Sequence, residues 1–292
     1  MALELTFLGT GTSAGVPMIG CDCPVCTSED PRDRRDRSSV VVRYPRENWS
    51  EESGLPPCFT VLIDASPEVR HQSIRHGVNW LDMLFLTHAH ADHILGLDDL
   101  RRFNSVMQGP LEFFAEPEVI QSVKQMFHYI FKDKHHYENA FVAKLLPLPI
   151  GPGQVVEIGQ AKWTPIRLMH GRLPILGYRV DWNGRSIAYC TDCSTIPHET
   201  LPQLEGLDVL VLDGLRERHH PTHMTLDRAC EFAEQINAKQ TYFTHIAHDH
   251  SHQELLERLP DRIEPAFDGL TLELQADTTE IITTISGPGG PA

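Results

Sequence analysis

The chain has 292 residues, of which 41% are hydrophobic, and a formal net charge of −15 at pH 7. This length and apolar content allow a substantial core in one large domain or in two. The negative charge argues against a long nucleic acid as partner, because polyanion binding depends on lysine and arginine, but it leaves a small phosphorylated substrate open.

Two further properties of the composition bear on location. No apolar run is long enough for a membrane span, and the first residues lack the basic and apolar regions of a secretory signal, so we expect a cytoplasmic protein. The seven cysteines include a tight trio. In a reducing compartment this pattern favours metal ligation over disulfides.

The first predicted strand, Leu3–Leu8, is followed by the glycine-rich loop Gly9–Gly15. This loop superficially resembles a dinucleotide-binding fingerprint. The glycine spacing is wrong for one, however, and Pro17 stands where a helix should begin. We predict a tight loop close to the active site.

A cysteine trio comes next, in Gly20-Cys-Asp-Cys-Pro-Val-Cys26. Its C-x-C-x₂-C spacing is close enough for Cys21, Cys23 and Cys26 to bind one Zn²⁺, and His248 is the preferred fourth ligand. The neighbours His250 and His252 stay open for that role. A closed Cys₃His tetrahedron would be structural, since no ligand position is left for substrate. The alternative is a set of three unligated thiols.

Two β-branched strands, Ser38–Tyr44 and Phe59–Ile63, are separated by a polar excursion over residues 45–57, which we expect to be a surface hairpin or loop. A helix is then predicted to start near Asp64, with Ser66 as its cap and Pro67 in its first turn.

The most informative segment is Leu84-Phe-Leu-Thr-His-Ala-His-Ala-Asp-His-Ile94. Its apolar start predicts a buried strand, so His88, His90, Asp92 and His93 fall on the loop that leaves this strand. Imidazole and carboxylate are suitable ligands for Zn²⁺, Mn²⁺ or Fe²⁺. A merely polar loop is the alternative.

The second half of the chain continues as short strands and helices, with a strong hairpin signal at Asn183-Gly184. The order of these strands resembles a meander, which favours two packed sheets with helices outside over a βαβ series. We expect one domain over residues 1–286 and a flexible tail over 287–292. The predicted strands are Leu111–Ala115, Val155–Ile158, Trp163–Met169, Ile175–Val180, Ser186–Tyr189, Val209–Leu212 and Thr241–Thr244, and the predicted helices are Pro117–Phe131, Leu226–Gln235 and Gln253–Leu259.

Three further candidate ligands stand where an apolar strand ends: His170, Asp192 and His245. Each is weak evidence by itself. With the four residues of the 88–93 cluster they make seven ligands, the number that a two-metal site needs.

At this point the chain resembles the metallo-β-lactamase superfamily, whose H-x-H-x-D-H motif is matched by His88 to His93. The resemblance implies an α/β four-layer αββα sandwich. It also implies that His88, His90 and His170 hold one metal and that Asp92, His93 and His245 hold the other, with Asp192 bridging the two ions.

The cysteine trio, followed by Asp-Pro-Arg at 30–32 and Arg-x-Arg-Ser-Ser at 35–39, resembles the PhnP-like phosphodiesterase branch, which is associated with phosphonate metabolism. The resemblance implies hydrolysis of phosphoribosyl 1,2-cyclic phosphate or 2′,3′-cyclic nucleotides by a metal-bridging hydroxide. It further implies two Mn²⁺ or Zn²⁺ ions and one structural Zn²⁺. The excursion at 45–57 is longer than the branch requires, and its role, including any effect on access to the site, is left open.

A proton donor for the leaving group is implied in the loop Arg216–Thr225. His223 best matches the general acid of the family, with His219 and His220 as alternatives, because imidazole has a pKa near working pH. Asp92 is counted with His223 among the catalytic groups.

Two other functions stay open: a tRNA 3′-processing nuclease, and a non-hydrolytic metal-binding or carrier protein of cofactor biosynthesis. The negative charge disfavours the first, and the complete set of seven ligands disfavours the second. As partners we expect a small phosphorylated substrate, no long nucleic acid and no membrane, and a homodimer is left open.

Overall fold

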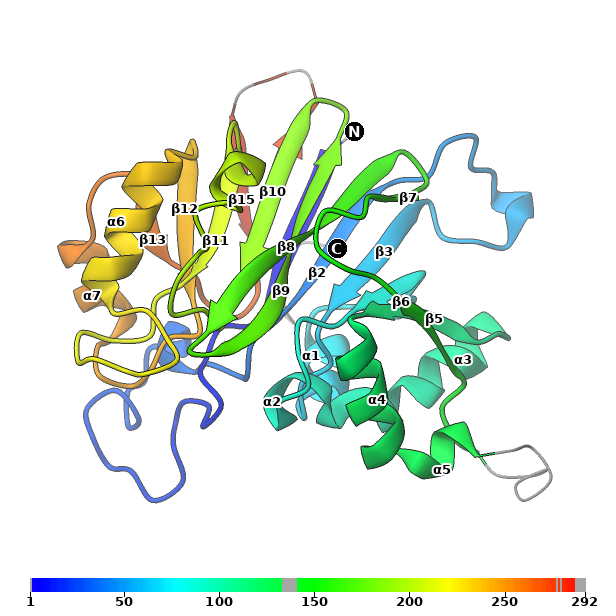
Figure 1. Ribbon diagram of the computed structural model, residues 1–292, viewed down its shortest axis with the longest axis horizontal. Helices are drawn as coiled ribbons and strands as arrows, with labels where there is room; N and C mark the ends of the chain where they lie inside the picture. The colour runs from blue at the N-terminus through cyan, green and yellow to red at the C-terminus, as the bar shows by residue number, and fades with distance from the viewer. Residues whose placement is uncertain (1, 133–140, 277, 279, 287–292) are drawn as a thin grey trace.

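The computed structural model describes residues 2–132, 141–276, 278 and 280–286 (Figure 1). The tail 287–292, for which we predicted flexibility, lies outside these residues. None of the helices in the described ranges is long and apolar enough to cross a membrane.

Two sheets form the centre of the molecule (Figure 1). One has eight strands in the order β15-β14-β1-β2-β3-β4-β5-β6, and the other has seven in the order β13-β12-β11-β10-β9-β8-β7. The strands of the first sheet are β1 Ala2–Gly9, β2 Ser39–Pro45, β3 Cys58–Ile63, β4 Met83–Phe85, β5 Leu111–Ala115, β6 Leu145–Pro149, β14 Leu270–Gln275 and β15 Ile281–Ile285. Those of the second are β7 Val156–Ile158, β8 Ala161–His170, β9 Leu173–Trp182, β10 Arg185–Cys190, β11 Val209–Asp213, β12 Gln240–Thr244 and β13 Ile263–Pro265.

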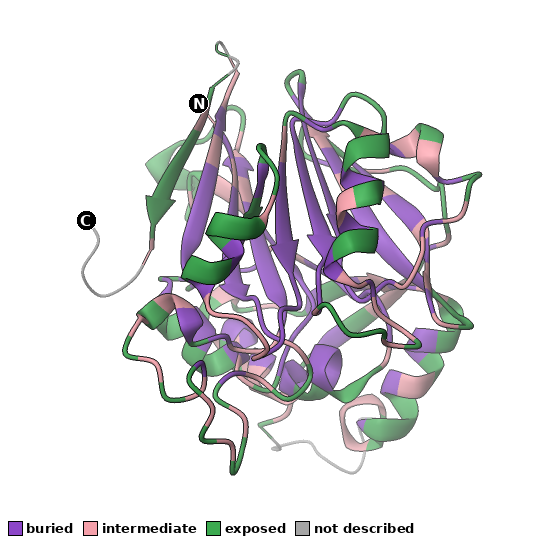
Figure 2. Ribbon diagram, turned by 90° about the vertical axis from the view of Figure 1, so that its left-hand side faces the viewer, coloured by how far each residue is buried: buried purple, intermediate pink, exposed green. Residues whose placement is uncertain are grey.

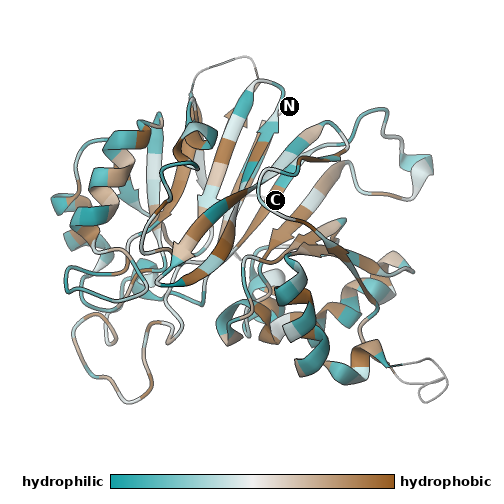
Figure 3. Ribbon diagram, in the orientation of Figure 1, coloured by the Kyte–Doolittle hydropathy of each residue, from teal (hydrophilic) through white to brown (hydrophobic). Residues whose placement is uncertain are grey.

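Helices cover the outer face of each sheet, with polar residues turned to the outside (Figures 2 and 3). The first five pack on the eight-stranded sheet through one buried cluster, and the last two pack on the seven-stranded sheet through another. The helices are α1 Val69–Arg75, α2 Ala91–Ile94, α3 Arg101–Met107, α4 Pro117–Met126, α5 His128–Phe131, α6 Leu226–Ile236 and α7 His252–Arg258.

A third cluster fills the space between the sheets. Strand β1 contributes Leu3, Leu5 and Phe7 to it, at the two-residue period that places alternate side chains on one face of a strand. Phe85 of one sheet stacks on Trp163 of the other, with ring centroids 4.9 Å apart. These layers confirm the predicted αββα sandwich.

The predicted meander is wrong for part of each sheet. Strands β3 to β6 run parallel to one another, as do β10 to β13, and helices make several of the crossovers. Parallel neighbours require such crossovers. The strands β6, β13, β14 and β15 and the helices α2 and α3 were not predicted. Helix α2 carries Asp92 and His93, which were predicted to lie on a loop. The hairpin at Asn183-Gly184 is confirmed, since both residues have the positive φ, 47° and 75°, that this tight turn requires.

Two helix predictions differ from the structure. The predicted helix 117–131 is interrupted at Phe127, so α4 and α5 are separate. Helix α1 begins at Val69, and Ser66 caps the turn before it by accepting a hydrogen bond from the Glu68 amide at 3.2 Å. The predicted helix start near Asp64 is therefore too early. Ser66 does cap a backbone amide, but in the turn that precedes the helix.

The excursion forms a closed surface loop in which the Trp49 indole donates to the Leu55 carbonyl at 2.6 Å. It joins the end of β2 to the start of β3, whereas Asp64 and the histidine cluster follow the other end of β3 and its parallel neighbour β4. The loop and the histidine cluster therefore lie at opposite ends of these strands.

Candidate metal centres

The candidate ligands gather at one end of the strands, where strands of both sheets finish. His88 follows β4, His170 ends β8, Asp192 follows β10 and His245 follows β12. A polar side chain placed just after a buried strand emerges at this end, held by a rigid scaffold.

The first group consists of His88, His90 and His170, whose ligand atoms lie within 4.8 Å of one another. The Nδ1 of His170 donates to the Asp192 carbonyl at 2.7 Å, which leaves its Nε2 free to bind a metal. Thr87 holds the Nδ1 of His88 at 2.9 Å. The Nε2 of His88 is buried and has no hydrogen-bond partner among the described residues.

The second group consists of Asp92, His93, Asp192 and His245, all buried and again within 4.8 Å. The Nδ1 of His93 donates to Asp64 at 2.6 Å, so its Nε2 faces Asp192 at 3.2 Å and Asp92 at 3.3 Å. The Nε2 of His245 lies 3.1 Å from the same Asp192 oxygen.

The carboxylates of the second group attract positive charge strongly. Burial by itself would lower the pKa of His245, but Asp192 and Asp92 raise this pKa to about 10. His93 behaves in the same way, because Asp192 and Asp64 raise its pKa well above the usual value against the effect of burial. The negative electrostatic potential of these carboxylates, which stabilises a protonated imidazole, would also stabilise a bound divalent cation.

Asp192 connects the two groups. It belongs to the second group, and its side chain also lies within 4.8 Å of the ligand atoms of His170 and His223. Thr191 donates to one of its oxygens at 2.7 Å and fixes the rotamer. Its backbone has φ 57°, and Asp64 and His245 also have positive φ, at 62° and 60°. Such conformations are costly in residues with a Cβ and cluster at functional sites.

The residues present fit a pair of divalent metals. Neutral imidazole nitrogens and carboxylate oxygens are the donors that Zn²⁺ and Mn²⁺ accept. The buried Nε2 atoms of His88, His93 and His245 have no hydrogen-bond partner among the described residues. A buried polar atom without a partner is costly, and metal ligation would satisfy all three.

The three cysteines surround His248, which lies three residues after the candidate ligand His245. Their Sγ atoms lie 3.4, 3.3 and 3.6 Å from its Nδ1 for Cys21, Cys23 and Cys26. Tetrahedral Zn²⁺ with ordinary bond lengths places sulfur and nitrogen roughly 3.5 Å apart, so the four groups fit one zinc ion. A hydrogen bond from the Cys26 amide lowers the pKa of Cys23 to about 6, which favours the thiolate that binds metal.

The structure places the other two candidates for the fourth ligand elsewhere. The Nε2 of His250 faces Glu217 at 3.5 Å, and the amide of His252 donates to Asp33 at 2.6 Å. Of the three histidines, His248 is the one that lies beside the thiols.

His223 lies beside the ligands, with its ring 4.7 Å from that of His170 and 4.5 Å from that of His245. Its Nδ1 is 2.8 Å from Asp213, and its side chain is 10% exposed. The carboxylate accepts from Nδ1–H, so Nε2 points away from Asp213. The alternative His219 is exposed, and His220 bonds to Thr222, with its ring 4.9 Å from His223.

Two acidic residues of this site were not predicted as functional. Asp64 orients His93 and also accepts hydrogen bonds from the amide and hydroxyl of Thr87, both at 2.8 Å. Asp213 orients His223. Both residues stand at the carboxyl end of a buried strand, β3 and β11, which is the signal that identified Asp192 and could have identified them.

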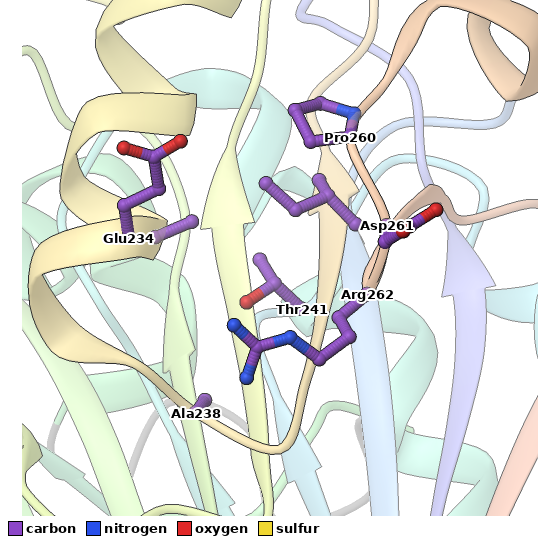
Figure 4. Close-up of a pocket in the computed structure, with 8 residues that line it drawn as sticks. Glu234, Ala238, Thr241, Pro260, Asp261 and Arg262 are labelled. Carbon is purple, nitrogen blue, oxygen red and sulfur yellow. The ribbon is translucent and has the colours of Figure 1, made fainter.

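A separate pocket of about 390 Å³ lies between α6 and the segment leading into β13 (Figure 4). Ala238 and Thr241 line it at the amino end of β12, whereas His245 follows the carboxyl end of that strand. It is therefore not part of the ligand cluster.

Residues 60–246 match the family model described as a beta-lactamase superfamily domain. Among solved structures, the chain is similar to a diphosphatase from the PhnP family, with 42% identity, a TM-score of 0.82 and coverage of 94% of this chain and 98% of that one.

Two curated proteins give further likenesses. An octanoyltransferase of Porphyromonas gingivalis is 37% identical over 270 residues, which cover 92% of this chain and 51% of that protein. The chain thus spans about half the length of this relative. A ribonuclease Z of Crocosphaera subtropica is 30% identical over 185 residues, which cover 61% of this chain and 47% of that one.

Proposed function

The chain belongs to the beta-lactamase superfamily and to its PhnP branch, and from this premise we propose that it is a phosphodiesterase with two divalent metals. We further propose that its substrates are small phosphodiesters such as phosphoribosyl 1,2-cyclic phosphate or 2′,3′-cyclic nucleotides. Its metals would be Mn²⁺ or Zn²⁺, with one structural Zn²⁺.

Seven residues would hold the catalytic pair. One ion would take His88, His90 and His170, and the other would take Asp92, His93 and His245. Asp192 would be shared, since its side chain lies near ligand atoms of both groups. Two such ions supply a hydroxide nucleophile at neutral pH and neutralise phosphate oxygens.

The residues around the ions do three things in this mechanism. Asp64, Thr87 and the Asp192 carbonyl hold Nδ1 of His93, His88 and His170, so that the Nε2 of each ring would be left to bind a metal. All of these ligands except the exposed His90 are buried, which strengthens their electrostatic interactions. His223 donates the proton that the leaving alkoxide needs, from an Nε2 oriented by Asp213.

The observation that carries the proposal is the Asp213–His223 pair beside the metal ligands. Hydrolysis of an unactivated diester produces an alkoxide that has to be protonated. The His223 ring lies next to one ligand of each group, His170 and His245. A protein that only carries metal would not need such a donor.

The nuclease alternative has the ribonuclease Z relative in its favour, but that match covers 61% of the chain. A formal charge of −15 opposes the binding of a long polyanion. We therefore retain the small diester as the substrate class.

His223→Ala tests the proposal. The variant should lose about 100-fold or more in kcat on 2′,3′-cyclic AMP, whose leaving group is a poor alkoxide, and much less on bis-p-nitrophenyl phosphate, whose leaving group needs no proton. Metal content should not change. His219→Ala, at an exposed position of the same loop, is the matched control. Equal losses on both substrates would exclude a general acid, and a wild-type protein that binds metal but cleaves neither diester would refute the phosphodiesterase.

A further inference from the structure

We propose that Arg35 is a positioning residue that couples the cysteine site to the two-metal centre. The proposal rests on the metal ligation proposed above. It concerns the loop from His245 to Ser251, which joins β12 to α7 and carries a ligand of each centre.

The guanidinium of Arg35 is completely buried and binds this loop at two points. One of its terminal nitrogens donates to the Ala247 carbonyl, and the other donates to the His250 carbonyl at 3.0 Å. These two carbonyls lie on either side of His248 in the sequence, and His248 is the proposed ligand of the cysteine site. A planar, forked guanidinium can hold two carbonyls at a fixed separation, which a lysine ammonium cannot do.

Asp33 contacts both Arg35 and the residue that follows the loop, and we call Arg35 and Asp33 together the clamp. The Oδ1 of Asp33 lies 3.3 Å from the second terminal nitrogen of Arg35 and accepts from the His252 amide at 2.6 Å. This acidic group neutralises a buried charge that would otherwise be costly. Arg35 and Asp33 thus bind the loop at Ala247 and His250 and the first residue of α7, His252.

Further contacts tie the clamp and the loop to the amino-terminal segment. The backbone of Arg35 pairs with Val16 in both directions, at 2.9 and 2.8 Å, and the Ile246 amide donates to the Thr10 carbonyl at 2.8 Å. The segment that carries the cysteines begins directly after Val16.

Coupling follows from the spacing of the ligands. His245 and His248 are three residues apart, and the clamp fixes the carbonyl between them and the carbonyl after them. A displacement of this loop therefore moves Nε2 of His245 and Nδ1 of His248 together. Binding at one centre should then favour binding at the other, by the same factor in both directions.

The test uses Arg35→Lys, which keeps the charge but loses the fork, and Co²⁺ as the probe. Thiolate-to-Co²⁺ charge-transfer absorption reports the cysteine site, and the visible bands of histidine and carboxylate ligation report the catalytic site. We expect about 10- to 100-fold weaker Co²⁺ binding at the catalytic site, together with a changed thiolate band, in a protein that still unfolds cooperatively.

Arg32→Lys is the matched control, because Arg32 pairs with Asp30 in the same segment but is 36% exposed and has no bond to the loop. Cys23→Ser should weaken the catalytic site in the wild-type background and add little when Arg35 is already lysine. Wild-type affinities in Arg35→Lys, or additive losses in the double variant, would overturn the coupling.

Should Arg35→Lys not fold, Asp33→Asn gives the same measurement with the guanidinium retained. It should weaken both sites to a smaller extent, and unchanged affinities would count against the clamp. No readout depends on turnover, so failure of the phosphodiesterase proposal and failure of the coupling are distinguishable.

Discussion

Acidic residues at or just beyond the carboxyl ends of buried strands organise the histidines of this site. Asp64 fixes His93, Asp213 fixes His223, and Asp192 lies between the two ligand groups. In the first two cases the carboxylate accepts a hydrogen bond from Nδ1–H, which fixes the tautomer. The Nε2 atom is then left to bind metal in His93 or to donate a proton in His223. Asp192 itself faces the Nε2 atoms of His93 and His245.

Asp192→Ala should abolish turnover and lower the metal content of the catalytic site, because two cations placed close together need anionic charge between them. Metal analysis of the purified variant beside kcat on bis-p-nitrophenyl phosphate checks this. Asp227→Ala, at an exposed position of α6, should change neither quantity. Full activity in the Asp192 variant would rule out the bridging role.

At the scale of single elements, α7 begins with a histidine that is held neutral. Burial lowers the pKa of His252 to about 4, and Arg32 and Arg35 act in the same direction. The amino end of a helix also disfavours a cation. The unfolded chain binds a proton near pH 6.5, so this group stabilises the fold above that pH, and the stability is lost as the pH falls toward 4.

His252→Gln should therefore make the unfolding free energy less dependent on pH between about 6.5 and 4. Urea unfolding at fixed metal concentration, compared with wild type at each pH, isolates this group from the metal ligands. His71→Gln, on the exposed face of α1, serves as the control. An identical pH profile for wild type and the His252 variant would show that the buried imidazole does not contribute.

The loop between β2 and β3 gives a second test at this scale. Replacement of residues 47–56 by Asn-Gly makes a two-residue hairpin, which the antiparallel pairing of Pro45 with Cys58 allows. Arg46 and its ion pair with Asp82 stay in place. We expect kcat/KM to stay within about threefold of wild type, since the loop lies at the far end of the strands. A larger loss in a folded variant would contradict this placement.

At the scale of the whole molecule, the amino-terminal segment and the last ligand loop are joined across more than two hundred residues of sequence. Cys23 and His248 meet at 3.3 Å with a separation of 225 residues. A zinc ion bound there closes a long loop of chain, which restricts the unfolded state and adds metal-binding free energy to folding.

Cys23→Ser should accordingly lower the zinc content by about one ion per chain and reduce the melting temperature. Cys58→Ser provides the control, since Cys58 lies on β3 and outside the cysteine cluster. Metal analysis and thermal unfolding of both variants give the comparison. Unchanged zinc content in the Cys23 variant would remove the structural site.

The sequence by itself determined the parts of this protein that depend on local pattern. Apolar alternation in β1 and the run before His88 predicted strands, and the spacing of His88, His90, Asp92 and His93 predicted a metal loop, because these signals lie within a few residues of one another. Strand ends indicated His170, Asp192 and His245, and the strand order favoured two packed sheets with helices outside. The αββα sandwich and the assignment of each ligand to one of two ions came from the resemblance that this loop supports.

Only the tertiary structure decided which distant residues meet. Asp64 and Asp213 have the strand-end position that a sequence shows, but their roles depend on the side chains that the fold brings beside them, His93 and His223. The parallel order of β10 to β13 and the placement of Arg35 under the last ligand loop are likewise products of packing. A hydrogen bond between residues hundreds of positions apart leaves no local pattern in the chain, since its geometry exists only after the fold forms.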